Sequence, residues 1–242
     1  MGDVAYGPGR RLAAWGVHAY TALGLPLGVI AAEALHHGDA ARFFACMWAT
    51  CAIDATDGML ARKVRVKDVV PHFDGSLLDN LVDYLTFAFL PALALPGLGL
   101  VSGPGAWIAM LPVLASGYQF CQANAKTEDS FVGFPSYWNI VVLYLYVLHA
   151  SPTVTIVVIT VLSVLAFVPI HYLYPSKATF LRVPTFVLGG LWAVALVPVC
   201  FAPDAEWAVR VTQVSVLFPV YYLVASLVSD AKRRASLSGR AT

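Results

Sequence analysis

The feature that most constrains the fold is a succession of apolar stretches, most of them about as long as a membrane-spanning helix. An α-helix needs about 20 apolar residues to cross the hydrocarbon core of a bilayer. About eight such stretches can be drawn, near residues 13–36, 41–61, 76–98, 105–125, 136–150, 152–174, 184–202 and 207–229. Gly- and Pro-rich motifs such as PGLGLVSGPG mark the turns between them. The sequence therefore predicts an all-α, polytopic membrane helical bundle.

Composition supports a membrane protein with one compact domain over residues 1–242. The chain is 59% hydrophobic and only 12% charged, which leaves too little polar surface for a soluble domain of this length. Nucleic acid is not an expected partner, because the sequence has no basic block and no platform of alternating basic and aromatic residues. Membrane lipids are the expected surroundings.

The distribution of Lys and Arg predicts the orientation of the bundle. If the N-terminus is cytoplasmic, only Arg42 and Arg210 fall on the opposite side of the membrane. Cytoplasmic loops carry an excess of Lys and Arg. We therefore expect an even number of spans, with both termini on the cytoplasmic side of the membrane. The expected location is the inner membrane of a bacterium.

Four aspartates interrupt the apolar sequence between residues 54 and 83. Asp54 and Asp57 lie three residues apart on the second span, while Asp79 and Asp83 lie four residues apart on the third. At about 3.6 residues per turn, each pair shares a helix face. Because the two spans run in opposite directions, the four carboxylates are expected at one depth, near the cytoplasmic surface.

Carboxylates gathered in a medium of low dielectric constant repel one another and favour a bound cation. Oxygen ligands suit Mg²⁺, Mn²⁺ or Ca²⁺ rather than zinc. The alternative is a set of acids paired with the basic residues Arg62, Lys63, Arg65 and Lys67. Ionisable residues inside a membrane are costly and usually mark function, so a metal site is the preferred interpretation.

Small residues and one arginine share the faces that carry the acids. Gly58 and Ala61 follow Asp54 by four and seven residues, and Gly75 precedes Asp79 by four. Glycine has no Cβ, so a ligand can approach the backbone closely, although close helix packing is the alternative explanation. The guanidinium of Arg62 suits a phosphate oxygen.

Together these residues resemble the signature of the CDP-alcohol phosphatidyltransferases. The matching pattern is Asp54-x-x-Asp57-Gly58-x-x-Ala61-Arg62, followed by Gly75-x-x-x-Asp79-x-x-x-Asp83. The spacer between Arg62 and Gly75 is longer than in most members. This spacer and the eight expected spans are similar to a bacterial branch whose acceptor alcohol is choline. The resemblance covers about the first 60% of the chain, and the last three spans carry little specific signal.

The resemblance implies a reaction and a set of roles. Family members transfer the phosphatidyl group of CDP-diacylglycerol to an alcohol and release CMP. The implied ligands of one or two Mn²⁺ or Mg²⁺ ions are Asp54, Asp57, Asp79 and Asp83, and Asp83 is also the implied base. The implied CDP-diacylglycerol site consists of Asp57, Gly58, Ala61, Arg62 and Gly75. Homodimers are common in the family, but no interface can be identified in the sequence.

Choline is a quaternary ammonium, which proteins hold with aromatic faces and carboxylates. The region 118–144 is rich in aromatic residues and is the expected acceptor-recognition region. The candidate choline-binding residues are Tyr84, Tyr118, Glu128, Tyr137 and Trp138. For each aromatic residue, the alternative is membership of the aromatic belt at the membrane surface.

Two other functions are considered. The first is the same chemistry with serine, inositol or glycerol phosphate as the acceptor; Lys126, Lys177 and Arg182 could supply charge for a phosphorylated acceptor. The second is a cation transporter, in which the acids would form a transport site. A transporter predicts acids at the midplane and internal repeats. Here the acids are expected near one leaflet, and no repeat is visible.

Overall fold

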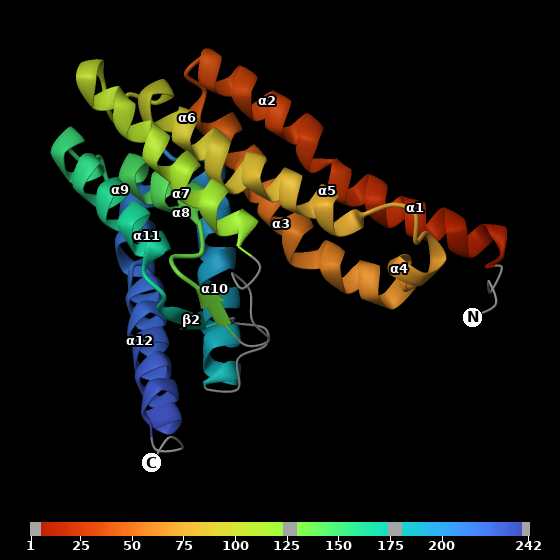
Figure 1. Ribbon diagram of the computed structural model, residues 1–242. Helices are drawn as coiled ribbons and strands as arrows, with labels where there is room; N and C mark the ends of the chain where they lie inside the picture. Colours follow the sequence, from red (N-terminus) through yellow and green to blue (C-terminus); the bar gives the residue numbers. More distant parts are fainter. Residues whose placement is uncertain (1–5, 123–129, 174–180, 239–242) are drawn as a thin grey trace.

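The computed structural model describes residues 6–122, 130–173 and 181–238, which are folded mainly into helices (Figure 1). The first half contains α1 (Pro8–Ala22), α2 (Gly24–His36), α3 (Ala40–Val64), α4 (Val66–Val69), α5 (Gly75–Asp83), the π-helical segment η1 (Tyr84–Phe89) and α6 (Leu90–Gly97). The rest contains the 3₁₀ helix η2 (Gly103–Ala109), α7 (Met110–Cys121), β1 (Ser130–Val132), α8 (Trp138–Val147), α9 (Pro152–Phe167), β2 (His171–Leu173), α10 (Arg182–Phe201), α11 (Glu206–Ser215) and α12 (Leu217–Ser238).

The helices that carry the aspartates begin and end at residues suited to those positions. Gly38 adopts φ +67°, and the Asp39 side chain then accepts a hydrogen bond from the Arg42 amide at 2.9 Å to cap α3. The carboxylate of Asp74 caps α5 by accepting from the amides of Ser76 and Leu77, both at 3.0 Å. Each cap satisfies amides that a helix N-terminus leaves without a partner.

Helix α1 packs against both α3 and α5, and α2 packs against α3 and α6. Only Leu23 separates α1 from α2, and its backbone is still right-handed helical, so the two continue one another (Figure 1). The first span therefore lies beside both helices that carry the aspartates.

The apolar core lies where α3, α6, α8 and α10 meet. Its largest fully buried side chains include Phe43, Phe44, Leu95, Trp138 and Leu196. By contrast, α10 and α12 expose large apolar side chains, among them Leu191 and Leu217, which are 64% and 72% exposed. In water such exposure would be unfavourable, whereas lipid tails accept it.

Within the described residues, four helical stretches are long and apolar enough to cross a membrane: Pro8–His36, Gly75–Gly97, Arg182–Phe201 and Glu206–Ala235. Two shorter apolar helices are Trp138–Val147 and Pro152–Phe167. The protein is thus an all-α membrane protein in its broad class, as the sequence predicts. The expectation of about eight spans, with both termini cytoplasmic, stays a prediction.

The predicted helix over 152–174 is too long, because α9 ends at Phe167. Pro169 disfavours helical backbone at the preceding residue, and Val168 is extended with φ −86° and ψ 123°. The chain then forms β2, which pairs antiparallel with β1. This short sheet is absent from the sequence-based expectation.

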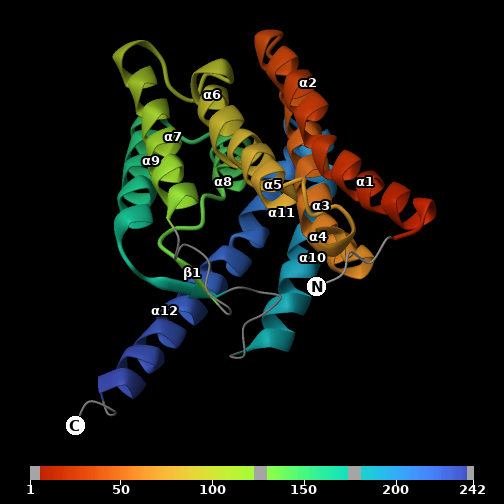
Figure 2. The same cartoon turned by 45° about the vertical axis from the view of Figure 1, so that its right-hand side comes forward.

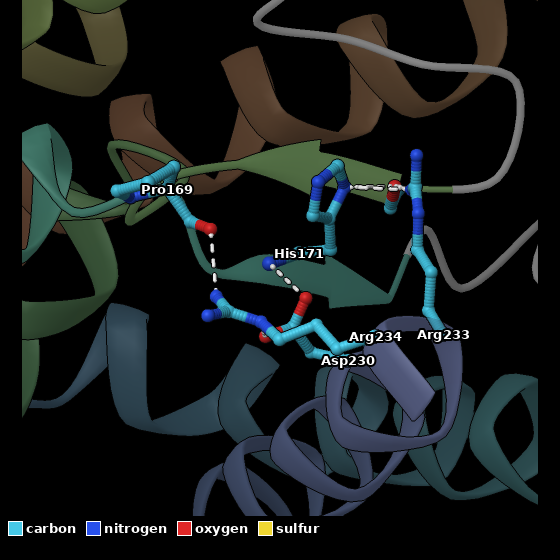
Figure 3. Close-up of polar contacts among 6 residues, drawn as sticks. Pro169, His171, Asp230, Arg233 and Arg234 are labelled. Carbon is cyan, nitrogen blue, oxygen red and sulfur yellow. Dashed lines mark hydrogen bonds and ion pairs between the residues drawn. The ribbon is translucent and has the colours of Figure 1, made fainter. Parts of the chain in front are cut away.

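Helix α12 holds the two-stranded sheet in place. Asp230 is buried and accepts a hydrogen bond from the His171 amide at 3.4 Å, while Arg234 pairs with Asp230 at 2.8 Å and donates to the Pro169 carbonyl at 3.1 Å (Figure 3). The guanidinium of Arg233 donates to His171 Nδ1 at 2.8 Å. The C-terminal end of α12 extends beyond the neighbouring helices (Figure 2). The last helix therefore braces the two-stranded sheet, whose β1 lies within the acceptor-recognition region.

Candidate active site

Three of the four aspartates form a compact cluster between α3 and α5. One carboxylate oxygen from each of Asp54, Asp57 and Asp79 lies within 4.8 Å of the others. Asp57 is buried, Asp79 is half-buried and Asp54 is exposed. The cluster therefore has one side in the protein interior and one side open to its surroundings, as a site for an exchangeable ligand requires.

Asp83 is the last residue of α5 and is buried. It lies one turn beyond Asp79, on the same face of the helix. The cluster defined by mutual oxygen distances contains the other three aspartates but not Asp83. Its expected roles as base and as metal ligand stay predictions.

A hydroxyl from the first span orients the buried carboxylate. The Oγ1 atom of Thr21 donates to Asp57 Oδ2 at 2.8 Å, and both residues are buried. One residue earlier, the Tyr20 and Thr56 hydroxyls lie 2.9 Å apart. A hydrogen bond that involves a charged group is stronger than one between neutral groups. Helix α1 therefore fixes the position of a cluster carboxylate.

The two signature glycines have different surroundings. A Cβ built on Gly58 would meet only Arg62 Nη1, at 3.4 Å, and otherwise open space. A Cβ on Gly75 would lie 2.5 Å from Cε1 of His18, so this glycine makes room for the imidazole ring. Close packing is thus the observed reason for glycine at 75. The expected contact of each glycine with CDP-diacylglycerol stays a prediction.

The other signature residues lie at the C-terminal end of α3. Ala61 is half-buried and packs at the edge of a small apolar cluster that includes Val66 and Val70. Arg62 is exposed, and its guanidinium reaches back toward Gly58. The guanidinium of Arg62 therefore lies beside the open backbone at Gly58.

The expected choline-binding residues in the described part of the chain differ in their surroundings, and their shared role stays a prediction. Tyr84 directly follows Asp83, stacks edge-to-face on Phe120 at 6.0 Å and donates to the Val113 carbonyl at 3.1 Å. Tyr118 is 45% exposed and packs on Phe167 of α9.

The remaining candidates differ in accessibility. Tyr137 is half-buried at the start of α8. Trp138 is fully buried, and its indole N–H donates to Ser116 at 2.8 Å. Glu128, like Lys126 and Lys177, lies outside the described residues. Tyr84 therefore lies nearest in sequence to the aspartates, whereas Trp138 belongs to the core.

Comparison with known proteins supplies the family. No family model matches the chain. A phosphatidylcholine synthase of Legionella pneumophila is 43% identical over 176 residues, covering 71% of this chain and 69% of the relative. The chain belongs to the phosphatidylcholine synthase family. A phosphatidylcholine synthase of Bradyrhizobium diazoefficiens is 39% identical over 194 residues, covering 77% of this chain and 71% of the relative.

The likeness to phosphatidylcholine synthases extends into the C-terminal helices. The phosphatidylcholine synthase of Borreliella burgdorferi is 31% identical over 224 residues, covering 91% of this chain and 96% of the relative. The sequence had given little specific signal for the last three spans. The match to this relative therefore includes sequence from these last helices.

The donor set of this phosphatidylcholine synthase family member fits a hard divalent cation. The cluster offers carboxylate oxygens only, within a span that one ion can bridge. Three ionised carboxylates this close repel one another, so a bound cation stabilises the arrangement. The cluster could therefore hold a metal ion, as the sequence predicts for Asp54, Asp57 and Asp79.

Sequence reasoning missed two residues of the first span, Thr21 and His18. Thr21 orients Asp57, and His18 fills the space beside Gly75. A threonine and a histidine in an apolar helix have no motif of their own. Only the packing of α1 against α3 and α5 reveals their part in the site.

Proposed function

We propose that this protein is a phosphatidylcholine synthase, which transfers the phosphatidyl group of CDP-diacylglycerol to choline and releases CMP. The observation that carries the proposal is the oxygen-only cluster of Asp54, Asp57 and Asp79 in a chain at least 37% identical to several proteins of that name. A divalent cation in this cluster would neutralise charge on the phosphoryl oxygens and on the leaving group.

The aspartates have distinct roles in this proposal. Asp54, Asp57 and Asp79 hold the cation, Mn²⁺ or Mg²⁺, and Thr21 keeps the Asp57 carboxylate in position. Asp83 accepts the proton of the choline hydroxyl. The choline oxygen then bonds to the phosphatidyl phosphorus, and the bond from that phosphorus to the CMP oxygen breaks. A positioned base of this kind contributes about 10²- to 10⁴-fold to the rate.

The nucleotide and phosphate part of CDP-diacylglycerol lies along Asp57, Gly58, Ala61, Arg62 and Gly75. The open backbone at Gly58 and the exposed guanidinium of Arg62 support this placement. Arg62 contributes a planar set of N–H donors that matches phosphate oxygens. The acyl chains remain in the bilayer, beside the exposed apolar side chains of the helices.

The choline site lies beyond Asp83. Tyr84 is the leading candidate for contact with the trimethylammonium group, because it follows Asp83 and lies against Phe120 at the end of α7. Tyr118, Tyr137 and Glu128 are further candidates. The buried indole of Trp138 supports the region through its bond to Ser116.

The proposed topology has about eight spans in one domain, with both termini and the aspartate cluster on the cytoplasmic side of a bacterial inner membrane. The basic residues at the ends of α3 and α12 support this orientation, since positive residues favour the cytoplasmic side. Both water-soluble compounds, choline and CMP, would then exchange with the cytoplasm.

The test of function supplies purified protein with CDP-diacylglycerol, Mn²⁺ and one labelled acceptor at a time: choline, serine, inositol or glycerol phosphate. Labelled phosphatidylcholine and an equal amount of CMP should appear with choline only. Label in another phospholipid would replace the acceptor but keep the reaction class. Absence of product with every acceptor would refute the proposal.

A further inference from the structure

His18 is a buried histidine that packs against Gly75, the first residue of the helix that carries Asp79. Its side chain lies on α1 and is 6% exposed. The imidazole ring packs on Phe73, with 4.4 Å between ring centroids, and on Trp15, with 5.7 Å. Its Cε1 edge faces Gly75, where a Cβ would overlap it. The ring is therefore held in one place by its neighbours on three sides.

One nitrogen of this ring lacks a hydrogen-bond partner. Nε2 of His18 is buried, and no atom of the described residues bonds to it. Buried polar atoms in folded proteins are almost always hydrogen-bonded, so an exception needs a reason. The apolar contacts of the ring would be made equally well by phenylalanine, which has no such unsatisfied nitrogen.

The position of His18 links it to the reaction centre. Thr21 lies three residues further along α1, on the same helix face, and donates to the cluster carboxylate of Asp57. On the other side of His18 lies Gly75, the first residue of α5. His18 thus lies between Gly75 and the turn of α1 whose Thr21 orients the cluster.

We propose that His18 Nε2 forms a hydrogen bond to the nucleotide part of CDP-diacylglycerol, and that His18 is a substrate-binding residue of this enzyme. This inference rests on the proposed function, which places the nucleotide beside Gly75. The ribose hydroxyls, the base and the phosphates of that substrate are all hydrogen-bonding groups.

Choline is a poorer partner for His18 for two reasons. Its trimethylammonium group neither donates an N–H nor accepts a hydrogen bond, which leaves only the hydroxyl that reacts. Gly75 and Asp83 are also eight residues apart on α5, which corresponds to about 12 Å along a helix. The base expected to meet the choline hydroxyl is therefore distant from His18.

Two substitutions separate hydrogen bonding from packing. His18→Phe keeps an aromatic ring against Phe73 and Trp15 but removes both nitrogens. His18→Gln removes the ring but carries an amide to about the position of Nε2. The first readout is the Kd of detergent-solubilised protein for CDP without choline, by isothermal titration calorimetry. The second is KM for CDP-diacylglycerol and for choline.

The proposal predicts that His18→Phe weakens CDP binding about tenfold, equivalent to about 1.4 kcal/mol, and raises KM for CDP-diacylglycerol with KM for choline unchanged. His18→Gln should recover most of the affinity. Wild-type affinity in His18→Phe, or a change in KM for choline alone, would overturn the proposal. An unchanged Kd in a folded His18→Phe protein, judged by its Tm, would assign His18 to packing.

The binding measurement also separates this inference from the proposed function. If the wild-type protein binds CDP but makes no phosphatidylcholine, the proposed function is refuted. The CDP affinities of His18→Phe and His18→Gln still decide whether His18 binds the nucleotide. If the wild type makes phosphatidylcholine and His18→Phe binds CDP normally, only the role of His18 fails.

Discussion

Thr21→Val tests how the first span contributes to the metal site. The substitution keeps the shape of the side chain and removes the hydroxyl that donates to Asp57 Oδ2 at 2.8 Å. Both residues are buried, so no bulk water replaces the lost bond. The Asp57 carboxylate is then free to rotate out of the geometry that the cluster requires.

The expected size of the effect follows from the kind of bond. A hydrogen bond to a charged group contributes about 1.5–3 kcal/mol, and about 1.4 kcal/mol corresponds to a tenfold change in affinity. Removal of a group that orients a metal ligand lowers the metal affinity about 10- to 100-fold. Thr21→Val should therefore weaken Mn²⁺ binding about 10- to 100-fold.

Electron paramagnetic resonance of free Mn²⁺ measures this affinity without any substrate. Thr21→Ser keeps the hydroxyl and should bind Mn²⁺ nearly as well as the wild type. Thr160→Val is a matched control, since the Thr160 hydroxyl on α9 donates to the Ile156 carbonyl of its own helix at 2.7 Å. Unchanged or tighter Mn²⁺ binding in Thr21→Val would refute the reasoning.

Two further substitutions test the packing around the site and the bracing by α12. Gly75→Ala places a Cβ 2.5 Å from His18 Cε1, so it should lower the free energy of unfolding by about 1–3 kcal/mol. This loss of stability should be smaller when His18 is also replaced by Ala. A Tm of Gly75→Ala equal to that of the wild type would contradict the close packing of Gly75 on His18. Asp230→Ala leaves the Arg234 guanidinium and the His171 amide without their carboxylate, so it should cost about 1–3 kcal/mol, measured as a lower Tm in detergent. An unchanged Tm would show that Asp230 does not contribute to bracing the sheet.

Much of the aspartate site could be predicted from the sequence, because its order is local. Asp54 and Asp57 share a face of α3 by helical spacing, and Asp79 follows Gly75 on α5 in the same way. The antiparallel arrangement of two successive spans then brings the pairs together, and three of these carboxylates do lie within ligand distance of one another.

The contacts made by α1 could not be predicted, because they depend on tertiary packing. Nothing in the local sequence states that Thr21 faces Asp57 rather than lipid, or that His18 fills the space beside Gly75. The end of α9 could have been predicted from Pro169, since the residue before proline avoids helical backbone. The pairing of the following strand with β1 joins distant segments and leaves no local pattern.

The aromatic residues are difficult for a different reason, because the same aromatic-rich sequence is compatible with a binding site and with a packed core. Tyr118 and Trp138 both lie in the acceptor-recognition region, yet one is 45% exposed and the other is fully buried with its N–H bonded. Composition near a membrane surface does not distinguish a binding side chain from a packed one. The difference in burial makes a substitution of Tyr118 a better test of choline binding than a substitution of Trp138.

The most direct test of the reaction centre is the anomalous scattering of Mn²⁺ in crystals of the protein. We expect a peak between the carboxylates of Asp54, Asp57 and Asp79, and loss of both the peak and phosphatidylcholine synthesis in a folded Asp79→Asn variant. A Mn²⁺ peak bound elsewhere, or full activity in Asp79→Asn, would contradict this expectation.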